Sequence, residues 1–131
     1  MTESGVDCPF CRIAATRIVA EGVAALAFWD GHPLNPGHVL IAPRRHVASW
    51  FGANAAERDE ILRLADEARR IVIAKHAPDS FNLGINDGPA AGQTIPHLHL
   101  HLIPRYRGDV ADPRGGVRWI IPERAAYWKE R

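Results

Sequence analysis

The stretch IPHLHLHLIPR, residues 95–105, decides the fold prediction because it alternates histidine with leucine. His97, His99 and His101 stand two residues apart, and a leucine follows each of them. Two is the period of a β-strand, in which alternate side chains project to the same face, roughly 6.5–7 Å apart. The pattern therefore predicts a strand that carries three imidazoles on one face and three core leucines on the other.

Length and composition favour one domain over residues 1–131, because the chain is 47% hydrophobic and 24% charged. The net charge of +1 provides no broad basic surface for duplex nucleic acid. No apolar run approaches the length of a membrane span, and the start MTESGVDCPF lacks the charged-then-apolar order of a signal peptide. These features predict a cytoplasmic protein that binds neither membranes nor duplex nucleic acid.

One long helix is predicted to begin after Asn54. The run NAAE places Glu57 three residues after Asn54, which is the spacing of a capping box, and apolar residues follow at helical intervals. We expect this helix to end near Lys75 or His76, before Pro78. A second, short helix is expected over residues 9–15.

Strand-like runs lie on both sides of the long helix, at residues 17–20, 24–29, 38–43 and 81–87, and the histidine run follows. The order contains no β-α-β alternation, which favours an α+β fold over a parallel sheet. We therefore predict a roughly five-stranded antiparallel sheet with one long helix and short helices.

Three histidines on one strand face allow two kinds of chemistry, a three-imidazole metal site or a nucleophile with flanking helpers. The loop DGPAAGQT, residues 87–94, directly precedes them and offers Gly88, Gly92 and Thr94. Glycines of this kind can turn backbone amides toward an anion, and no acidic pair stands beside them to bind magnesium. The combination favours a phosphate site.

The run at 97–103 is similar to the signature His-φ-His-φ-His-φ-φ, with φ apolar, of the histidine triad family of nucleotide hydrolases and transferases. The resemblance extends through HPLNPGHVLIAP, residues 32–43, and INDGPAAGQT, residues 85–94, and covers nearly the whole chain. DGPAAGQTIPH is most similar to the fragile histidine triad branch of diadenosine polyphosphate hydrolases. CPFC, residues 8–11, resembles the zinc-bearing bacterial members.

The resemblance assigns catalytic roles to four histidines. His99 would attack the α-phosphorus and form a nucleotidyl-histidine, a step for which a neutral imidazole is competent near pH 7. His101 would contact phosphate, His38 would lie close to the nucleophile, and His97 is the first member of the triad. Donating imidazoles would offset the charge that builds on the phosphate oxygens.

The resemblance also implies a nucleotide-binding set. Asp30 would contact the ribose hydroxyls and Phe28 would wall the base, although without the family Asp30 in DGHP reads as a turn residue. The amide and hydroxyl positions of the loop would lie on the phosphate side. The full set comprises Phe28, Asp30, Asn86, Gly92, Gln93, Thr94, His99 and His101. In DPRGGVR, residues 112–118, Arg114 and Arg118 either reach the outer phosphates or belong to a flexible surface turn.

Cys8 and Cys11 form a C-x-x-C pair, which taken alone fits either zinc or thiol redox chemistry. A redox pair would open a helix after a strand, whereas this pair precedes every predicted strand. By resemblance, His46 and His97 complete the set, and the zinc would be structural because four protein ligands leave no position for water. Such an ion would orient His97 beside the nucleophile.

The function that we predict is hydrolysis or nucleotidyl transfer at the phosphoanhydride bonds of dinucleoside polyphosphates, through a nucleotidyl-histidine and without a required catalytic metal. By resemblance the enzyme would be a homodimer. Three alternatives are a purine nucleoside phosphoramidase, a nucleotide-binding signalling module with incidental activity, and a zinc hydrolase that uses His97, His99 and His101 as ligands.

Overall fold

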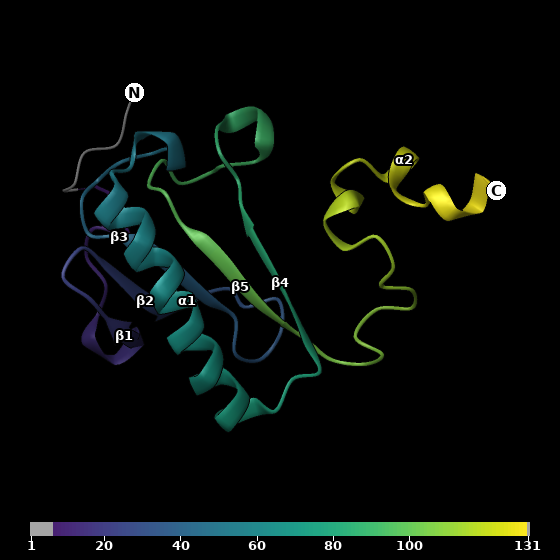
Figure 1. Ribbon diagram of the computed structural model, residues 1–131, viewed down its shortest axis with the longest axis horizontal. Coiled ribbons are helices and arrows are strands. Elements are labelled where there is room, and N and C mark those ends of the chain that lie inside the picture. Colours follow the sequence, from purple (N-terminus) through teal and green to yellow (C-terminus); the bar gives the residue numbers. More distant parts are fainter. Residues whose placement is uncertain (1–6, 131) are drawn as a thin grey trace.

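Five antiparallel strands form a single sheet in the computed structural model of the protein, which describes residues 7–130 (Figure 1). The strands follow the order β1-β2-β3-β5-β4 across the sheet. One long helix and several short helical turns complete the fold. The α+β prediction is confirmed. The strands are β1 (Ile18–Glu21), β2 (Ala25–Trp29), β3 (Val39–Pro43), β4 (Ser80–Ile85) and β5 (Leu100–Arg105).

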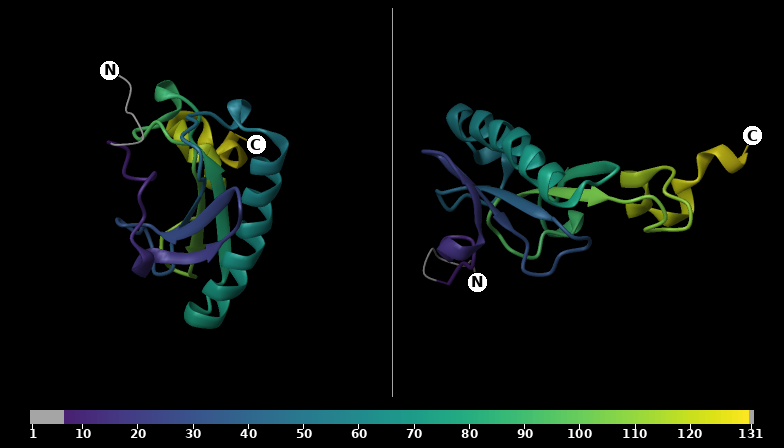
Figure 2. Two further views of the ribbon diagram at one scale, coloured as in Figure 1. Left: turned by 90° about the vertical axis from the view of Figure 1, so that its left-hand side faces the viewer. Right: turned by 90° about the horizontal axis from the view of Figure 1, so that it is seen from below.

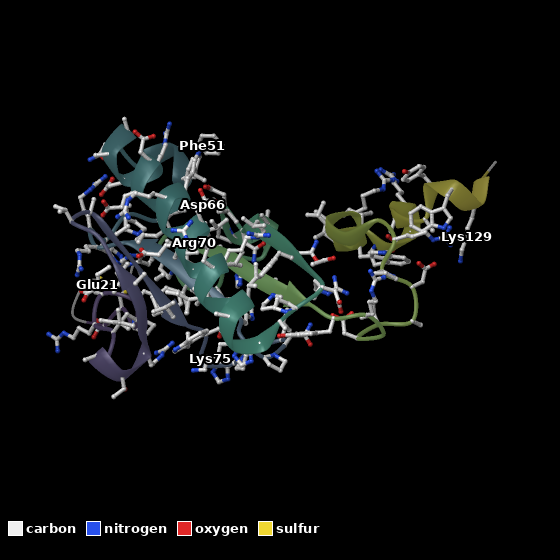
Figure 3. All side chains as sticks on the ribbon, turned by 60° about the horizontal axis from the view of Figure 1, so that its bottom comes forward. Glu21, Phe51, Asp66, Arg70, Lys75 and Lys129 are labelled. Carbon is white, nitrogen blue, oxygen red and sulfur yellow. The ribbon has the colours of Figure 1, made fainter. Side chains whose placement is uncertain are left out.

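The long helix α1 (Ala55–His76) packs across one face of the sheet, as Figure 2 shows. The Asn54 side chain accepts a hydrogen bond from the Glu57 amide, and the Glu57 carboxylate accepts one from the Asn54 amide. This capping box satisfies two amides of the first turn, so the predicted start and end of the helix are confirmed. Asp66 and Arg70 lie on its exposed side (Figure 3).

The central strands are buried on both faces. The core under α1 includes Leu98, Leu100 and Leu102, which confirms the predicted apolar face of the histidine run. On the opposite face, the N-terminal turn packs Phe10 against Phe28 and other apolar side chains of β2 and β3. His97 and His99 are therefore enclosed between the sheet and the N-terminal turn, with Phe10 against both rings.

Two sequence predictions of local structure are wrong. Residues 9–12 form turns and bends, with a hydrogen bond from the Cys11 amide to the Cys8 carbonyl, and residues 13–14 have no regular structure. The helical piece that follows is the short 3-10 turn η1 (Ala15–Arg17). The last strand begins at Leu100 because the chain turns at His97, whose amide donates to the Ile95 carbonyl over 2.8 Å. In both segments, hydrogen bonds within a turn take the place of the helical or inter-strand hydrogen bonds that were predicted.

Residues 112–130 form a C-terminal arm that projects beyond β4 (Figures 1 and 2). The arm contains η4 (Gly116–Ile120), α2 (Pro122–Ala125) and η5 (Tyr127–Glu130). It is held by its own contacts: Trp119 Nε1 donates to the Arg114 carbonyl, and the Arg114 guanidinium lies 4.6 Å from the centre of the Trp128 ring. Gly115, with a φ of 92°, leaves room for Trp128.

None of the helices within residues 7–130 combines the length and the apolar composition that a membrane span requires.

Candidate active site and metal centre

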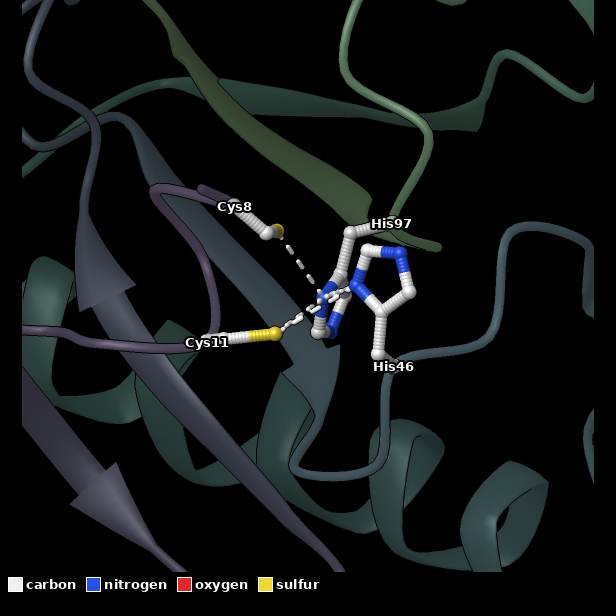
Figure 4. Close-up of side chains that lie close together, drawn as sticks. All are labelled: Cys8, Cys11, His46 and His97. Atoms are coloured by element: carbon white, nitrogen blue, oxygen red, sulfur yellow. Dashed lines mark hydrogen bonds between the residues drawn. The ribbon is translucent and has the colours of Figure 1, made fainter. Parts of the chain in front are cut away.

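The side chains of two cysteines and two histidines, from three segments that are distant in the sequence, lie close together (Figure 4). Cys8 and Cys11 come from the N-terminal turn, His46 follows β3, and His97 precedes β5. His97 Nδ1 lies 3.4 Å from Cys8 Sγ, 3.5 Å from Cys11 Sγ and 3.2 Å from His46 Nδ1. Cys11 Sγ lies 3.3 Å from His46 Nδ1. We call these four residues the metal cluster.

The metal cluster fits a tetrahedral zinc ion. Zinc with its usual bonds to sulfur and imidazole nitrogen places neighbouring ligand atoms about 3.3–3.6 Å apart, close to the separations found here. His97 Nε2 lies 2.8 Å from the Pro43 carbonyl, so this nitrogen carries the proton and Nδ1 keeps a lone pair for a metal. These four side chains can hold a metal ion, and four protein ligands leave no position for a substrate.

His99 has the protonation geometry of a nucleophile. Its Nδ1 lies 2.7 Å from the His97 carbonyl and therefore carries the proton, which leaves the lone pair on Nε2. Phe10 packs edge-on against the ring, with the centroids 4.9 Å apart, so the imidazole has little freedom to rotate. The sequence reasoning missed Phe10, although its position between the two cysteines of CPFC was a usable signal.

His38 and His101 are linked in a chain of hydrogen bonds that begins at the Leu34 amide. The Leu34 amide donates to His38 Nδ1 over 3.1 Å, which places the His38 proton on Nε2. That nitrogen lies 3.0 Å from His101 Nδ1 and 3.4 Å from Asp30 Oδ2. His101 Nδ1 thus accepts, and its proton lies on Nε2, where it can be donated to a substrate oxygen. Asp30, His38, His99 and His101 are the candidate catalytic residues, and we call them the catalytic cluster.

Burial keeps both histidines of this pair neutral. Loss of hydration lowers the pKa of His101 to about 4; repulsion from His99 and His38 in their protonated forms acts in the same direction, and the Asp30 carboxylate opposes it. Burial also lowers the pKa of His38, while the nearby Asp30 carboxylate partly opposes this. At pH 7 the pair therefore supplies neutral N–H donors rather than cations.

Asp30 lies beside His38, whereas Phe28 has no exposed surface with which to contact a base. Asp30 Oδ1 accepts a hydrogen bond from the His32 amide over 2.7 Å, so the carboxylate also serves its turn. Its other oxygen faces His38. Phe28 is fully buried in β2 and contacts Phe10, with the ring centroids 5.2 Å apart.

The glycine-containing loop is braced by Gln93. Its side-chain oxygen accepts from the Gly88 amide over 2.8 Å, and its amide nitrogen donates to the carbonyls of Ala48 and Ile95. Gly92 has a φ of 92°, a conformation that favours glycine. In this structure Gln93 thus shapes the loop from within.

Three further loop positions differ in exposure and contacts. Asn86 and Thr94 are exposed on the loop, available to a ligand. Asp87, which the sequence reasoning did not single out, accepts hydrogen bonds from the Ser49 hydroxyl and the Trp50 amide. The DG dipeptide at the end of a strand suggested only a turn there, so no local signal pointed to this anchor.

The three triad histidines do not gather around one ion. Among residues 7–130, His97 belongs to the metal cluster, whereas His101 groups with Asp30 and His38, and His99 joins neither ligand group. The geometry does not support the alternative in which all three bind a catalytic zinc.

A model of the HIT domain matches residues 13–108. The chain belongs to the HIT family. A curated HIT relative, the bifunctional bis(5'-adenosyl)-triphosphatase/adenylylsulfatase FHIT of Arabidopsis thaliana, is 42% identical over 77 residues, 59% of this chain and 43% of that protein. The AP-4-A phosphorylase of Mycobacterium tuberculosis is 34% identical over 93 residues, 70% of this chain and 48% of that protein. The chain thus spans less than half the length of these two enzymes.

A solved structure of a zinc-bound histidine triad family protein from Mycobacterium smegmatis has the same HIT fold. It matches with a TM-score of 0.72 and 29% identity, over 83% of this chain and 82% of that one. The likeness covers most of both chains, and the neighbour is a zinc-bound protein.

Proposed function

We propose that this HIT protein cleaves dinucleoside polyphosphates by nucleotidyl transfer to His99. The hydrogen bond from His99 Nδ1 to the His97 carbonyl carries the proposal, because it leaves the Nε2 lone pair available for attack. The diadenosine-type substrates in the names of the plant and mycobacterial relatives support this substrate class.

The proposed reaction has two steps. His99 Nε2 attacks the α-phosphorus, a P–N bond forms, and the P–O bond to the remaining phosphates breaks, so these leave as an anion with their nucleoside. Water then attacks the same phosphorus, the P–N bond breaks, and a nucleoside monophosphate departs. His101 Nε2–H, oriented through His38, donates to a non-bridging oxygen in both steps.

A zinc ion held by the metal cluster would tie the N-terminal turn to the segment before β5 and supply no reacting group. His97 joins the two sites, since its ring belongs to the metal cluster and its carbonyl fixes His99. We therefore propose that turnover requires no added divalent metal for the nucleophile.

The assembly that we propose is a homodimer of a single HIT domain in the cytoplasm. β4 lies at the edge of the sheet, and among residues 7–130 no strand pairs with its outer side. An uncovered strand edge is a surface that a second copy can cover.

Mass spectrometry of protein quenched during turnover of diadenosine triphosphate tests the proposal. We expect an adenylyl adduct on His99, and cleavage in ¹⁸O-labelled water should place one heavy oxygen on the adenosine monophosphate product. An adduct on another residue, or label found only on the adenosine diphosphate product, contradicts the proposed attack.

Rates on two substrate classes separate the proposed activity from a purine nucleoside phosphoramidase. We expect diadenosine tri- or tetraphosphate to be cleaved at a kcat/KM at least equal to that for adenosine 5'-phosphoramidate. A strong preference for the phosphoramidate would change the substrate class and leave His99 as the nucleophile.

A further inference from the structure

A cavity of about 950 Å³ lies on the outer face of β4 and β5, away from α1. It begins at His101 and Gly84 and is walled by Leu34 on one side and by Trp119 and Ile120 of the C-terminal arm on the other. Its size is in the range of small-ligand sites. The cavity is therefore a ligand-sized space that starts at the catalytic cluster and continues beyond it.

Gly84 keeps the floor of this cavity open. It lies in the interior of β4, directly opposite His101 in the strand register. A Cβ atom added there would meet no atom within 4 Å, and the backbone is not in the left-handed region, so neither crowding nor strain requires glycine. Glycine weakens a strand, and an interior glycine often marks a bulge, a bend or a place where a ligand approaches closely. β4 pairs with β5 without a shift of register, so no bulge accounts for Gly84.

The charges around the cavity do not suit a phosphate at its far end. The lining Arg105 pairs with Asp109, with both contacts at 2.8 Å, and donates to Asn82 over 2.7 Å. Arg114 pairs with Asp112, and Arg118 donates to main-chain carbonyls of the arm, and neither lines the cavity. The prediction that these two arginines reach the outer phosphates gains no support from their contacts.

We propose that this cavity binds the nucleoside of the leaving half of a dinucleoside polyphosphate, with its base stacked on Trp119. This inference deepens the proposed function and rests on it. The phosphate under attack lies at His99, the phosphate chain passes His101, and the second base enters the space beyond Gly84, where the lining charges are paired with one another or with Arg114.

The side chains that line the cavity predict that the leaving nucleoside is bound mainly by stacking and with little discrimination between bases. Three asparagines line the cavity, and the side chains of Asn82 and Asn35 are engaged with Arg105 and Asp109. The exposed Asn86 belongs to the loop that we expect on the phosphate side. Stacking on an aromatic ring tolerates every base and corresponds to roughly five- to hundredfold in affinity. We therefore expect adenosine and guanosine leaving halves to be accepted about equally.

The first test is the ratio of kcat/KM for diadenosine triphosphate to that for adenosine 5'-phosphoramidate, whose leaving group is ammonia. Trp119→Ala should lower this ratio about tenfold, and Trp119→Phe should retain most of it because the ring remains. The neighbouring Ile121→Ala, exposed but outside the cavity lining, is the matched control. An unchanged ratio for Trp119→Ala overturns the proposal. A loss with Trp119→Phe as large as with Ala would assign the effect to the bond with Arg114 and also overturn it.

The second test fills the cavity from its floor. Gly84→Val suits a strand and should lower the ratio about tenfold or more by occupying the space beside His101. Ser80→Val lies on the same strand and, by alternation, on the same face, outside the lining of this cavity, and should leave the ratio unchanged. Equal ratios in the two variants would contradict the proposal.

A binding measurement separates failure of this inference from failure of the proposed function. In the His99→Asn background, intact diadenosine triphosphate should bind at least about five times more tightly than adenosine monophosphate, and Trp119→Ala should abolish most of that difference. Equal affinities for the two ligands would refute the second subsite. The adduct experiment tests the nucleophile independently, so its failure is recognised separately.

Discussion

The metal cluster and the catalytic cluster both contain histidines from the same short run of chain, yet the metal cluster is closed and the catalytic cluster opens to a cavity. His97 is fully buried, and its Nδ1 faces two thiols and another imidazole. His101 is partly exposed and lines the cavity. In each histidine, the hydrogen bond made by one ring nitrogen decides what the other can do.

The comparison extends to His99, which stands between them. His97 donates through Nε2 to a carbonyl and presents Nδ1, whereas His99 donates through Nδ1 and presents Nε2. One arrangement suits a metal ligand and the other suits a nucleophile. Three imidazoles of identical chemistry thus present different ring nitrogens because their hydrogen-bond partners differ.

The largest expected effect comes from His99→Asn. Asparagine fills similar space but supplies no imidazole lone pair, so turnover of diadenosine triphosphate should fall by roughly a thousandfold or more. Binding of adenosine monophosphate, measured by calorimetry, should persist. His32→Asn, at an exposed histidine outside both clusters, is the control. Activity near that of the parent chain would remove His99 from the role of nucleophile.

His38→Ala should produce the next largest loss. Without His38 the proton on His101 is no longer fixed on Nε2, and removal of one oriented donor in a buried site typically costs about a hundredfold in kcat. The double variant His38→Ala/His101→Ala should be little worse than the His101→Ala variant, because the two residues act in series. Losses that multiply would show that His38 acts independently of His101.

Cys8→Ser should break the metal cluster and leave the residues of the catalytic cluster in place. Metal analysis of the parent chain should give about one zinc per chain, and the variant should lose it. Since a closed site couples metal binding to folding, the midpoint of thermal unfolding should fall by at least about 10 °C. Metal-free parent protein that unfolds at the temperature of the metal-loaded form would contradict a structural role.

The smallest effect concerns acid stability. The folded-state pKa of His101 is lowered to about 4 from an ordinary 6.5, and that of His38 is lowered as well. Between pH 6.5 and 4 the unfolded chain therefore binds more protons, and the free energy of unfolding falls as the pH falls. Thermal unfolding of His101→Gln between pH 7.5 and 4.5 should depend less steeply on pH than that of the parent. Metal release affects both proteins, so parallel curves would refute the assignment to His101.

Much of the fold follows from local patterns in the sequence. The leucines of the histidine run, the capping box at Asn54 and the apolar spacing of α1 all specify burial or hydrogen bonds within a few residues. The two wrong predictions have the opposite origin, because they concern segments whose contacts are not periodic in the sequence. The N-terminal turn brings Cys8 to the distant His97, and the chain turns at His97 itself, and neither feature follows from the spacing of apolar residues.

The sequence by itself determined which residues are candidates for the chemistry, because the spacing of His97, His99 and His101 and the pair of cysteines are local motifs. Only the tertiary structure decided how each acts. The Pro43 carbonyl that sets His97 lies 54 positions away, and the Leu34 amide, which sets the proton on His38, fixes His101 across a contact of 63 positions. The cavity likewise needs Leu34, Gly84 and Trp119 to meet. The physical reason is that a proton's position and a cavity's shape depend on neighbours in space, and chain folding alone selects these neighbours.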